Sequence, residues 1–206
     1  MSAKAEPRPL ILASGSRTRR EMLAAAGLAF EVVPADVDEI AIRDRFMSAN
    51  PNWRPQDVAI ALARAKAEDV SRRRPEALVI GSDQILSLGN RLMHKTTNLS
   101  EARENLILMR GAQHELHSAV ALAEAGQVTA TRTDSAQLRM RNFSDQFLDS
   151  YLLQAGEKCL ESVGVYQIES LGSQLFERIE GDHFTILGMP LLPLLDEFRT
   201  RGVLLI

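Results

Sequence analysis

The sequence predicts a single α/β domain with a mixed, partly antiparallel sheet, flanked by helices and containing a central cleft. Three observations indicate this class. Short apolar segments typical of buried strands alternate with helical segments along the chain. Adjacent strand-like segments separated by turn residues indicate antiparallel pairs within the same sheet. No linker, repeat or low-complexity tract divides the 206 residues, so we expect one domain over residues 1–206.

The composition is that of a globular protein with a substantial core, since 45% of the residues are hydrophobic and 25% are charged. The net charge of −3 argues against binding of nucleic acid through overall charge, although a local basic pocket for a small anion remains compatible with it. The one cysteine, Cys159, excludes an internal disulfide and fits a reducing compartment. The four histidines lack zinc-ligand spacing, and neither a signal peptide nor a membrane span is evident. We therefore expect a cytoplasmic protein without nucleic-acid or membrane partners.

The first elements along the chain form a short βαβ-like unit. Residues 10–13 are an apolar strand, and a helix follows over about residues 17–26 because Gly27 suits the position just past a helix end. The stretch FEVVPADVDE, residues 30–39, predicts a second strand that leaves into an acidic loop.

A second helix and a hairpin follow. Pro55 suits the first turn of a helix over about residues 56–72. The apolar stretch EALVIGSDQILSL, residues 76–88, predicts a buried strand. Gly89–Asn90 then predicts a two-residue turn into a partner strand over residues 91–95.

The next part predicts a capped helix and an antiparallel pair. Asn98 and Glu101 suit the N-cap and N3 positions of a helix that ends at Gly111. Residues 114–123 and 128–141 predict two paired strands, because apolar and polar side chains alternate along the second of them.

The last third predicts a further capped helix and two strands. Ser144 suits an N-cap, with Phe143 and Leu148 placed as a hydrophobic staple. Residues 163–198 predict two short strands, a turn and a final amphipathic helix.

Three arginines stand where the first predicted helix begins, which is the unfavourable end for cations. The helix dipole places partial positive charge there, so each exposed arginine is disfavoured by roughly 0.3–1 kcal/mol. Residues Ser14–Ser16 lie between strand and helix, where free backbone N–H groups bind anions. A bound polyphosphate would supply the missing negative charge; alternatively, Ser16 is a simple cap and the arginines are solvated, one of them paired with Glu21. The three are Arg19, the main candidate ligand, with Arg17 and Arg20.

Two charged residues fall on predicted apolar faces. Lys66 shares a helical sector with four apolar residues, so its ammonium must either extend to solvent or meet an anion. Asp83 interrupts an apolar strand just after Gly81, and a buried carboxylate is costly unless it is hydrogen-bonded, paired or bound to a metal. A functional role is therefore favoured for Asp83 over a cap at a strand end. The apolar neighbours of Lys66 are Ala59, Leu62, Ala63 and Val70.

Lys95 lies across the predicted hairpin from this carboxylate. Counting out from the turn in regular register pairs Lys95 with Gln84. A bulge would therefore be needed to bring Lys95 to the face of the sheet that carries Asp83.

Each of the remaining candidate carboxylates has two interpretations, a functional one and an ordinary surface position. Three carboxylates in PADVDE would suit Mg²⁺ or Mn²⁺ beside a phosphate site, or they are solvated loop residues. Glu169 is either a surface acid or a group that accepts hydrogen bonds from a base. The three loop acids are Asp36, Asp38 and Glu39.

Taken in order, these motifs resemble the Maf family of nucleoside triphosphate pyrophosphatases over essentially the whole chain. LILASGSRTRREML resembles the family's N-terminal ASxSPRRxxLL, VVPADVDE its acidic loop and LARAKA its helix lysine. VIGSDQILSLGNRLMHK resembles its GAD strand and GKP hairpin, and the stretch from VGVYQIES to GMPLLPLL resembles its C-terminal segment. The resemblance implies a Maf/ITPase-like fold and hydrolysis between the α and β phosphates of a nucleoside triphosphate, giving a monophosphate and pyrophosphate.

The resemblance also implies a role for each matched residue. Asp83 takes the acidic catalytic role, as a metal ligand or as the group that activates water. Glu39 assists at the metal, which would be Mg²⁺ or Mn²⁺. Lys66 and Lys95 neutralise phosphate charge during catalysis. Ser14 and Arg19 hold the triphosphate.

Three positions bear on the base. Where the subfamily linked to dTTP and UTP carries Arg, Thr and Gln, this chain has Thr18, Gln84 and Glu169. Gln84 and Glu169 resemble the subfamily linked to 7-methyl-GTP. A carboxylate accepts from the N1–H and the exocyclic amine of guanine together, a pair that thymine and uracil lack. The resemblance therefore implies a modified nucleotide such as 7-methyl-GTP as the substrate.

The family also implies an assembly and an alternative function. A homodimer is implied by the resemblance alone. The alternative is a nucleotide-binding regulator of septum formation or cell division with little or no turnover, which would bind nucleotide tightly and not depend on Asp83 for its function.

Overall fold

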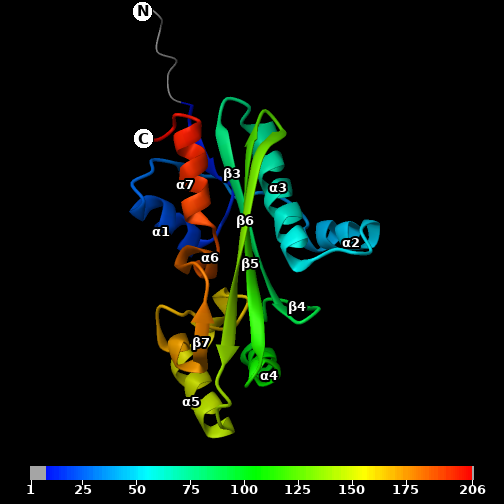
Figure 1. The fold of residues 1–206 in the computed structure, drawn as a ribbon, viewed down its shortest axis with the longest axis vertical. Coiled ribbons are helices and arrows are strands. Elements are labelled where there is room, and N and C mark those ends of the chain that lie inside the picture. Colours follow the sequence, from blue (N-terminus) through cyan, green and yellow to red (C-terminus); the bar gives the residue numbers. More distant parts are fainter. Residues whose placement is uncertain (1–7, 206) are drawn as a thin grey trace, which may run out of the picture.

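A mixed sheet of seven strands forms the centre of the molecule (Figure 1). The computed structural model describes residues 8–205. The strands are β1 (Leu10–Leu12), β2 (Glu31–Val32), β3 (Leu78–Leu88), β4 (Arg91–Met93), β5 (Gln113–Glu124), β6 (Gln127–Met140) and β7 (Phe176–Glu180). They run in the order β2-β1-β3-β5-β6-β7, with β4 also paired to β3. β1 is parallel to β2 and β3 and the other pairs are antiparallel, so the predicted mixed sheet is confirmed.

Different helices cover the two faces of this sheet (Figure 1). The helix α3 packs on one face, where its alanines meet Ala119 and Ala121 of β5. The helices α1 and α7 pack on the other, where Leu23 and Phe198 join Leu122 of β5 in one cluster. The helices are α1 (Arg17–Ala25), α2 (Glu39–Ala49), α3 (Pro55–Arg73), α4 (Leu99–Met109), α5 (Asp145–Ala155), α6 (His183–Leu187) and α7 (Leu191–Thr200), with short 3₁₀ turns η1 (Gly156–Glu161) and η2 (Leu171–Leu175).

Most predicted elements are confirmed together with the residues that begin them. The side chains of Ser16, Asn98 and Ser144 each accept a backbone N–H of the first helical turn, as capping residues do. Phe143 and Leu148 are both buried around the last of these caps, as a hydrophobic staple requires. The β3–β4 hairpin turns at Gly89–Asn90 in the predicted register.

The helix α2 was not predicted. It begins at Glu39, a residue that was expected to belong to the acidic loop. The loop ends at Asp38, whose Oδ1 accepts the N–H of Ala41 at 2.9 Å and so begins the helix. None of the α2 residues is buried. α2 projects from the body and packs mainly against α3, so it carries no strong apolar stripe, which is why the pattern did not reveal it (Figure 1).

The prediction of two short strands over residues 163–198 is wrong for the first of them. β7 is the one strand there, and the stretch before it forms turns and η2. The alternating apolar residues around Tyr166 resemble a strand, but Val165 has a φ of +61°, which no strand accommodates.

Gly81 is the residue that lets α3 approach β3 closely. A Cβ at this position would lie 2.1 Å from the carbonyl oxygen of Ala63 and 2.6 Å from the backbone nitrogen of Ala67. Because both atoms belong to a helix backbone, they cannot rotate away as a side chain would. This close contact brings the middle of α3 onto the middle of β3.

We expect Gly81→Ala to lower the free energy of unfolding by about 3 kcal/mol, because the added methyl group forces the helix away from the strand. Urea unfolding followed by circular dichroism measures the change. Gly15→Ala is the matched control, since a Cβ there meets nothing within 4 Å, and it should shift the free energy by less than about 0.5 kcal/mol. Equal effects of the two changes would contradict this account of the contact.

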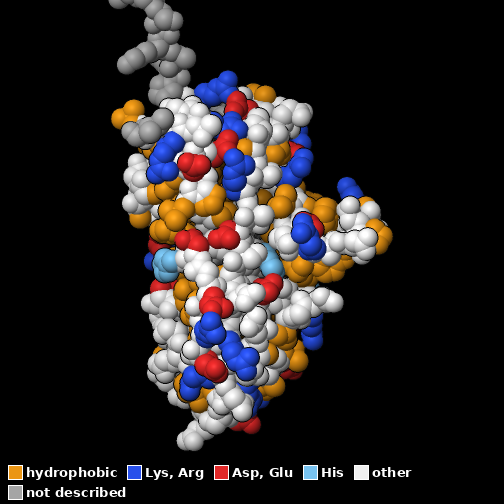
Figure 2. Space-filling model, viewed as in Figure 1, with side chains coloured by type: hydrophobic (Ala, Val, Ile, Leu, Met, Phe, Trp, Pro, Cys, Tyr) orange, Lys and Arg blue, Asp and Glu red, His pale blue; other side chains and the backbone are white. Residues whose placement is uncertain are grey.

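Two surface features complete the fold. Acidic and basic side chains are interspersed over the face seen in Figure 2, so this face shows no continuous patch of one sign. Within residues 8–205, every helix is too short or too polar to cross a bilayer.

Candidate active site

The sequence predicted a central cleft, and the structure has one at a gap along one edge of β3. On this edge β1 pairs only with Leu78–Ile80 and β4 only with Leu86–Leu88, so residues 81–85 have no strand beside them there. Two cavities, of about 620 and about 370 Å³, lie along the gap and share lining residues that include Gln84 and Lys95. They are therefore two parts of one cleft, the larger cavity and the smaller cavity.

A buried lysine lies between two carboxylates in the larger cavity. Lys66 Nζ, on α3, is 2.6 Å from Asp83 Oδ1 on β3 and 2.7 Å from Glu39 Oε1 at the start of α2. The side chains of Lys66 and Asp83 are each 9% exposed, whereas that of Glu39 is 54% exposed. Of the two alternatives for Lys66, contact with an anion is the one observed.

The surroundings of Asp83 change its acidity. Burial raises the pKa of the Asp83 carboxyl, while the positive charges of Lys66 and Arg19 act in the opposite direction. A carboxylate whose pKa is raised accepts a proton from water more readily than an exposed one. The position of Asp83 in the cleft therefore suits general base chemistry as well as metal binding.

Arg19 turns inward from the first turn of α1 and joins three separate segments of the cleft. Its Nε donates to the carbonyl of Gly188 at 2.9 Å, and its Nη1 donates to Ser14 Oγ at 3.2 Å and to the carbonyl of Ser82 at 2.9 Å. Two of these three acceptors are backbone atoms, so the guanidinium is fixed in place and its charge remains without a carboxylate partner in these contacts. This arrangement leaves a fixed positive charge next to Ser14 at the wall of the larger cavity.

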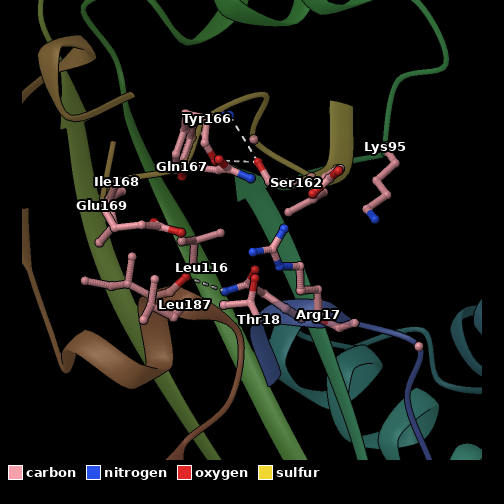
Figure 3. Close-up of a pocket in the computed structure, with 17 residues that line it drawn as sticks. Arg17, Thr18, Lys95, Leu116, Ser162, Tyr166, Gln167, Ile168, Glu169 and Leu187 are labelled. Atoms are coloured by element: carbon pink, nitrogen blue, oxygen red, sulfur yellow. Dashed lines mark hydrogen bonds between the residues drawn. The ribbon is translucent and has the colours of Figure 1, made fainter. Parts of the chain in front are cut away.

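The other two arginines are exposed, although Arg17 also lines the smaller cavity (Figure 3). Arg17 is exposed, and its Nε donates to Glu21 Oε1 at 2.6 Å. Arg20 is exposed as well. Periodicity could not separate Arg19 from its neighbours, because only the position of Gly188, 169 residues further along the chain, shows which arginine turns inward.

Lys95 lies just beyond the end of β4 and lines both cavities. Strand pairing ends at Met93, so neither the regular register nor the bulge considered for Lys95 and Asp83 applies. The side chain is exposed and lies across the cavity from Glu169 (Figure 3). The chain therefore carries Lys95 over the mouth of the cleft rather than along the sheet.

The smaller cavity contains the three residues that the sequence assigned to the base. Thr18 and Glu169 lie on different sides of it (Figure 3). Gln84 is held from behind, because its Nε2 lies 3.1 Å from Ser118 Oγ and 3.1 and 3.0 Å from the carbonyls of Thr185 and Ile186. These acceptors occupy the amide hydrogens, so the carbonyl oxygen is the group that Gln84 can offer to a ligand.

Comparison with known proteins identifies the family. The family model described as Maf-like protein matches residues 9–201. This chain belongs to the Maf family. It is 49% identical over 195 residues to a protein of Rhizobium meliloti named 7-methyl-GTP pyrophosphatase, covering 95% of this chain and 97% of the relative. It is 47% identical over 194 residues to a protein of Maricaulis maris named nucleoside triphosphate pyrophosphatase, covering 94% and 97%.

Two carboxylates of the Maf cleft could hold a divalent cation. Glu39 and Asp83 face the same ammonium of Lys66, while no group of three or more His, Cys, Asp or Glu suited to a metal occurs within the described residues. Mg²⁺ is commonly held by one or two carboxylates, with the remaining ligands from phosphates and water. The donor set therefore fits a metal that arrives with a phosphorylated substrate. Asp38 instead caps α2, and the backbone N–H of Asp36 donates to Asp69.

Several cleft residues of this Maf protein were not found from the sequence. They belong mainly to the irregular segment between η1 and η2, which forms one wall of the smaller cavity (Figure 3). The quoted motif VGVYQIE marked this segment, but as a strand it gave no reason to point its side chains at the cleft. The residues are Glu161, Ser162, Val163, Tyr166, Gln167 and Ile168.

Below neutral pH we expect this Maf protein to lose stability through His114. Burial lowers the pKa of His114 to about 4, from an ordinary value near 6.5. The unfolded chain therefore takes up this proton at higher pH than the folded chain, and acid favours unfolding between about pH 6.5 and about pH 4. The contribution is about 3 kcal/mol across this window.

Thermal or urea unfolding at a series of pH values tests this expectation. His114→Phe removes the titrating group. The free energy of unfolding of the wild type, relative to that of the variant, should therefore fall as the pH falls through the window. A difference that stays constant from pH 7 to pH 4 would show that His114 does not titrate in this way.

Proposed function

We propose that this chain hydrolyses nucleoside triphosphates between the α and β phosphates, releasing a nucleoside monophosphate and pyrophosphate. The observation that carries the proposal is the buried Lys66 beside Asp83 and Glu39 on the wall of the larger cavity. The printed names of the relatives, 7-methyl-GTP pyrophosphatase and nucleoside triphosphate pyrophosphatase, support the same reaction.

The triphosphate would occupy the larger cavity, where cations meet it from three sides. Arg19 and Ser14 lie at the N-terminus of α1, Lys66 comes from α3, and Lys95 lies at the mouth. These groups neutralise negative charge that develops on the phosphates as the bridging bond breaks. The charge of Arg19, held by backbone carbonyls, needs no reorganisation for this role.

In this proposal, Asp83 activates the attacking water. Its carboxylate takes a proton while the water oxygen forms a bond to phosphorus, and the bridging P–O bond breaks so that pyrophosphate leaves with the electron pair. The raised pKa of Asp83 makes it a better proton acceptor than an exposed aspartate. Lys66 keeps the carboxylate oriented through its contact at 2.6 Å.

A divalent cation, Mg²⁺ or Mn²⁺, would be held by Glu39 and Asp83 together with substrate phosphate oxygens. It would supply further neutralisation of phosphate charge and orient the reacting groups. In that state Lys66 would share its two carboxylates with the metal and turn part of its hydrogen-bonding capacity to the phosphates.

The base would occupy the smaller cavity. Gln84 offers its carbonyl oxygen and Glu169 a carboxylate, which together accept from the donor edge of guanine and match a substrate such as 7-methyl-GTP. Uracil and thymine present one ring N–H between two carbonyls, so they leave one of these acceptors unpaired. Thr18 adds a hydroxyl on the opposite wall (Figure 3).

We further propose that the protein works on free nucleotides in the cytoplasm, and a homodimer stays a prediction from the family.

The test is pyrophosphate release from a panel of 7-methyl-GTP, GTP, dTTP and UTP, each with Mg²⁺, with Mn²⁺ and with chelator. The proposal expects metal-dependent release with the highest kcat/KM for a guanine nucleotide. Preference for dTTP and UTP would overturn the assignment of the base. No pyrophosphate from any member would overturn the reaction.

A further inference from the structure

One wall of the smaller cavity depends on a segment without regular secondary structure. Residues 162–169 carry Gln167 and Glu169 to the cavity, yet they belong to no helix or strand. The segment is tied internally, because the backbone N–H of Tyr166 donates to Ser162 Oγ at 3.0 Å and that hydroxyl donates back to the carbonyl of Tyr166. Val165, with φ at +61°, is held by a bond from the Tyr151 hydroxyl to its carbonyl at 2.8 Å.

The ring of Tyr166 is the part of this segment that reaches the sheet. The segment folds closely around it, since a Cβ at Gly164 would lie 2.2 Å from ring atom Cε1. Phe176 packs edgewise against the ring, with centroids 4.7 Å apart. At the end of the ring, the hydroxyl lies 2.8 Å from Nε2 of His114, a residue of β5 that is 1% exposed.

The hydrogen between these two groups can be placed. Burial keeps the His114 ring neutral and the phenol of Tyr166 protonated, because it lowers the pKa of the first and raises that of the second. Within residues 8–205 the phenol has no other hydrogen-bond partner, and Nδ1 of His114 has none at all. The arrangement with the fewest unpaired groups has the phenol donating to Nε2 and the other ring hydrogen on Nδ1.

This arrangement leaves one buried N–H without an acceptor, which an apolar side chain would avoid. Within residues 8–205, the one polar contact of the His114 side chain is acceptance of the Tyr166 hydroxyl. His114 itself lines neither cavity. The polar atoms of the His114 side chain can therefore influence the cavity only through the hydrogen bond with Tyr166.

We propose that His114 is a positioning residue for nucleotide binding: by accepting the Tyr166 hydroxyl, it fixes residues 162–169 on the sheet and so places Gln167 and Glu169 against the base. The proposal rests on the proposed function for its ligand. It assigns His114 no contact with substrate and no part in the chemical step.

The test is a double-variant cycle with His114→Phe, Tyr166→Phe and both changes together. Each single variant should raise KM for 7-methyl-GTP about tenfold while kcat stays within about twofold, because binding and not chemistry is affected. The KM of the double variant should not exceed the higher of the two single-variant KM values, since all three variants lack the same hydrogen bond. The Kd for 7-methyl-GTP, measured by calorimetry, should rise in parallel.

Two further variants separate positioning from general damage to the sheet. His114→Gln restores an acceptor near the position of Nε2 and should bring KM back to within about threefold of wild type. His117→Phe is the matched control: His117 is a buried histidine of the same strand that contacts Ser87 and Ser135, and it lines neither cavity. It should leave KM unchanged even if it lowers stability.

The outcomes are distinct. Additive effects of the two single changes, loss of kcat at unchanged KM, or failure of His114→Gln to restore binding in a folded protein would each overturn the positioning role. Wild-type protein that binds 7-methyl-GTP without turnover would overturn the proposed reaction, while the Kd values of the same variants still decide the role of His114. Wild-type protein that does not bind this nucleotide would overturn both.

Discussion

Replacing Asp83 with asparagine should lower kcat for pyrophosphate release by about 10³-fold while the protein stays folded. The amide has the shape of the carboxylate, but it takes no proton from water and offers a divalent cation no negative oxygen. Lys66 retains Glu39 as a partner at 2.7 Å, so the variant does not leave its ammonium unpaired. Initial rates of pyrophosphate release, with unfolding curves of the same preparations, measure both quantities.

Asp38→Asn is the matched control for this change. Asp38 Oδ1 caps α2 through the N–H of Ala41, and asparagine caps a helix equally well. Its kcat should stay within about twofold of wild type. If Asp83→Asn kept more than about one tenth of the wild-type kcat, the carboxylate would be neither the proton acceptor nor an essential metal ligand.

Lys66→Met should abolish measurable turnover and also lower the free energy of unfolding by about 3–5 kcal/mol. The methionine fits the volume of the lysine stem, but it leaves the carboxylate of Asp83 buried without its partner at 2.6 Å. Glu39 is about half exposed and can be hydrated instead, so most of the cost comes from Asp83. Urea unfolding and pyrophosphate release report the two effects separately.

The double variant Lys66→Met/Asp83→Asn distinguishes the loss of the pair from the loss of packing. With neither charge present, most of the stability should return while activity stays absent. Lys95→Met should leave the free energy of unfolding within about 0.5 kcal/mol of wild type, because this lysine is exposed. A double variant as unstable as the sum of the two single variants would contradict the coupling of Lys66 and Asp83.

The centre of the cleft could be predicted from the sequence because its charges violate an apolar pattern. Lys66 stands on the buried face of a regular helix and Asp83 inside a buried strand, so periodicity alone marks both as needing a partner. The sequence could not pair them with each other, since it fixes neither the packing of α3 on β3 nor the close approach at Gly81. The strands, helix caps and hairpins around Lys66 and Asp83 follow from periodicity, capping residues and turn residues, so the sequence predicts these as well.

The rest of the cleft depends on contacts that no local pattern contains. Arg19 is distinguished from Arg17 by a carbonyl of Gly188, far along the chain. α2 brings Glu39 to the cleft without burying any residue of its own, and the wall around Tyr166 has an irregular backbone that includes a valine with positive φ. These parts are held by tertiary contacts, so sequence periodicity gave either no signal or the signal of a strand.

The most direct measurement is a ³¹P spectrum recorded while the wild-type protein acts on 7-methyl-GTP with Mg²⁺. The account expects resonances of the nucleoside monophosphate and of pyrophosphate to grow together in equal amounts. Nucleoside diphosphate with orthophosphate would show that the cleft directs water to the other bridging bond. An unchanged spectrum of bound nucleotide would contradict the hydrolytic function and favour a nucleotide-binding regulator.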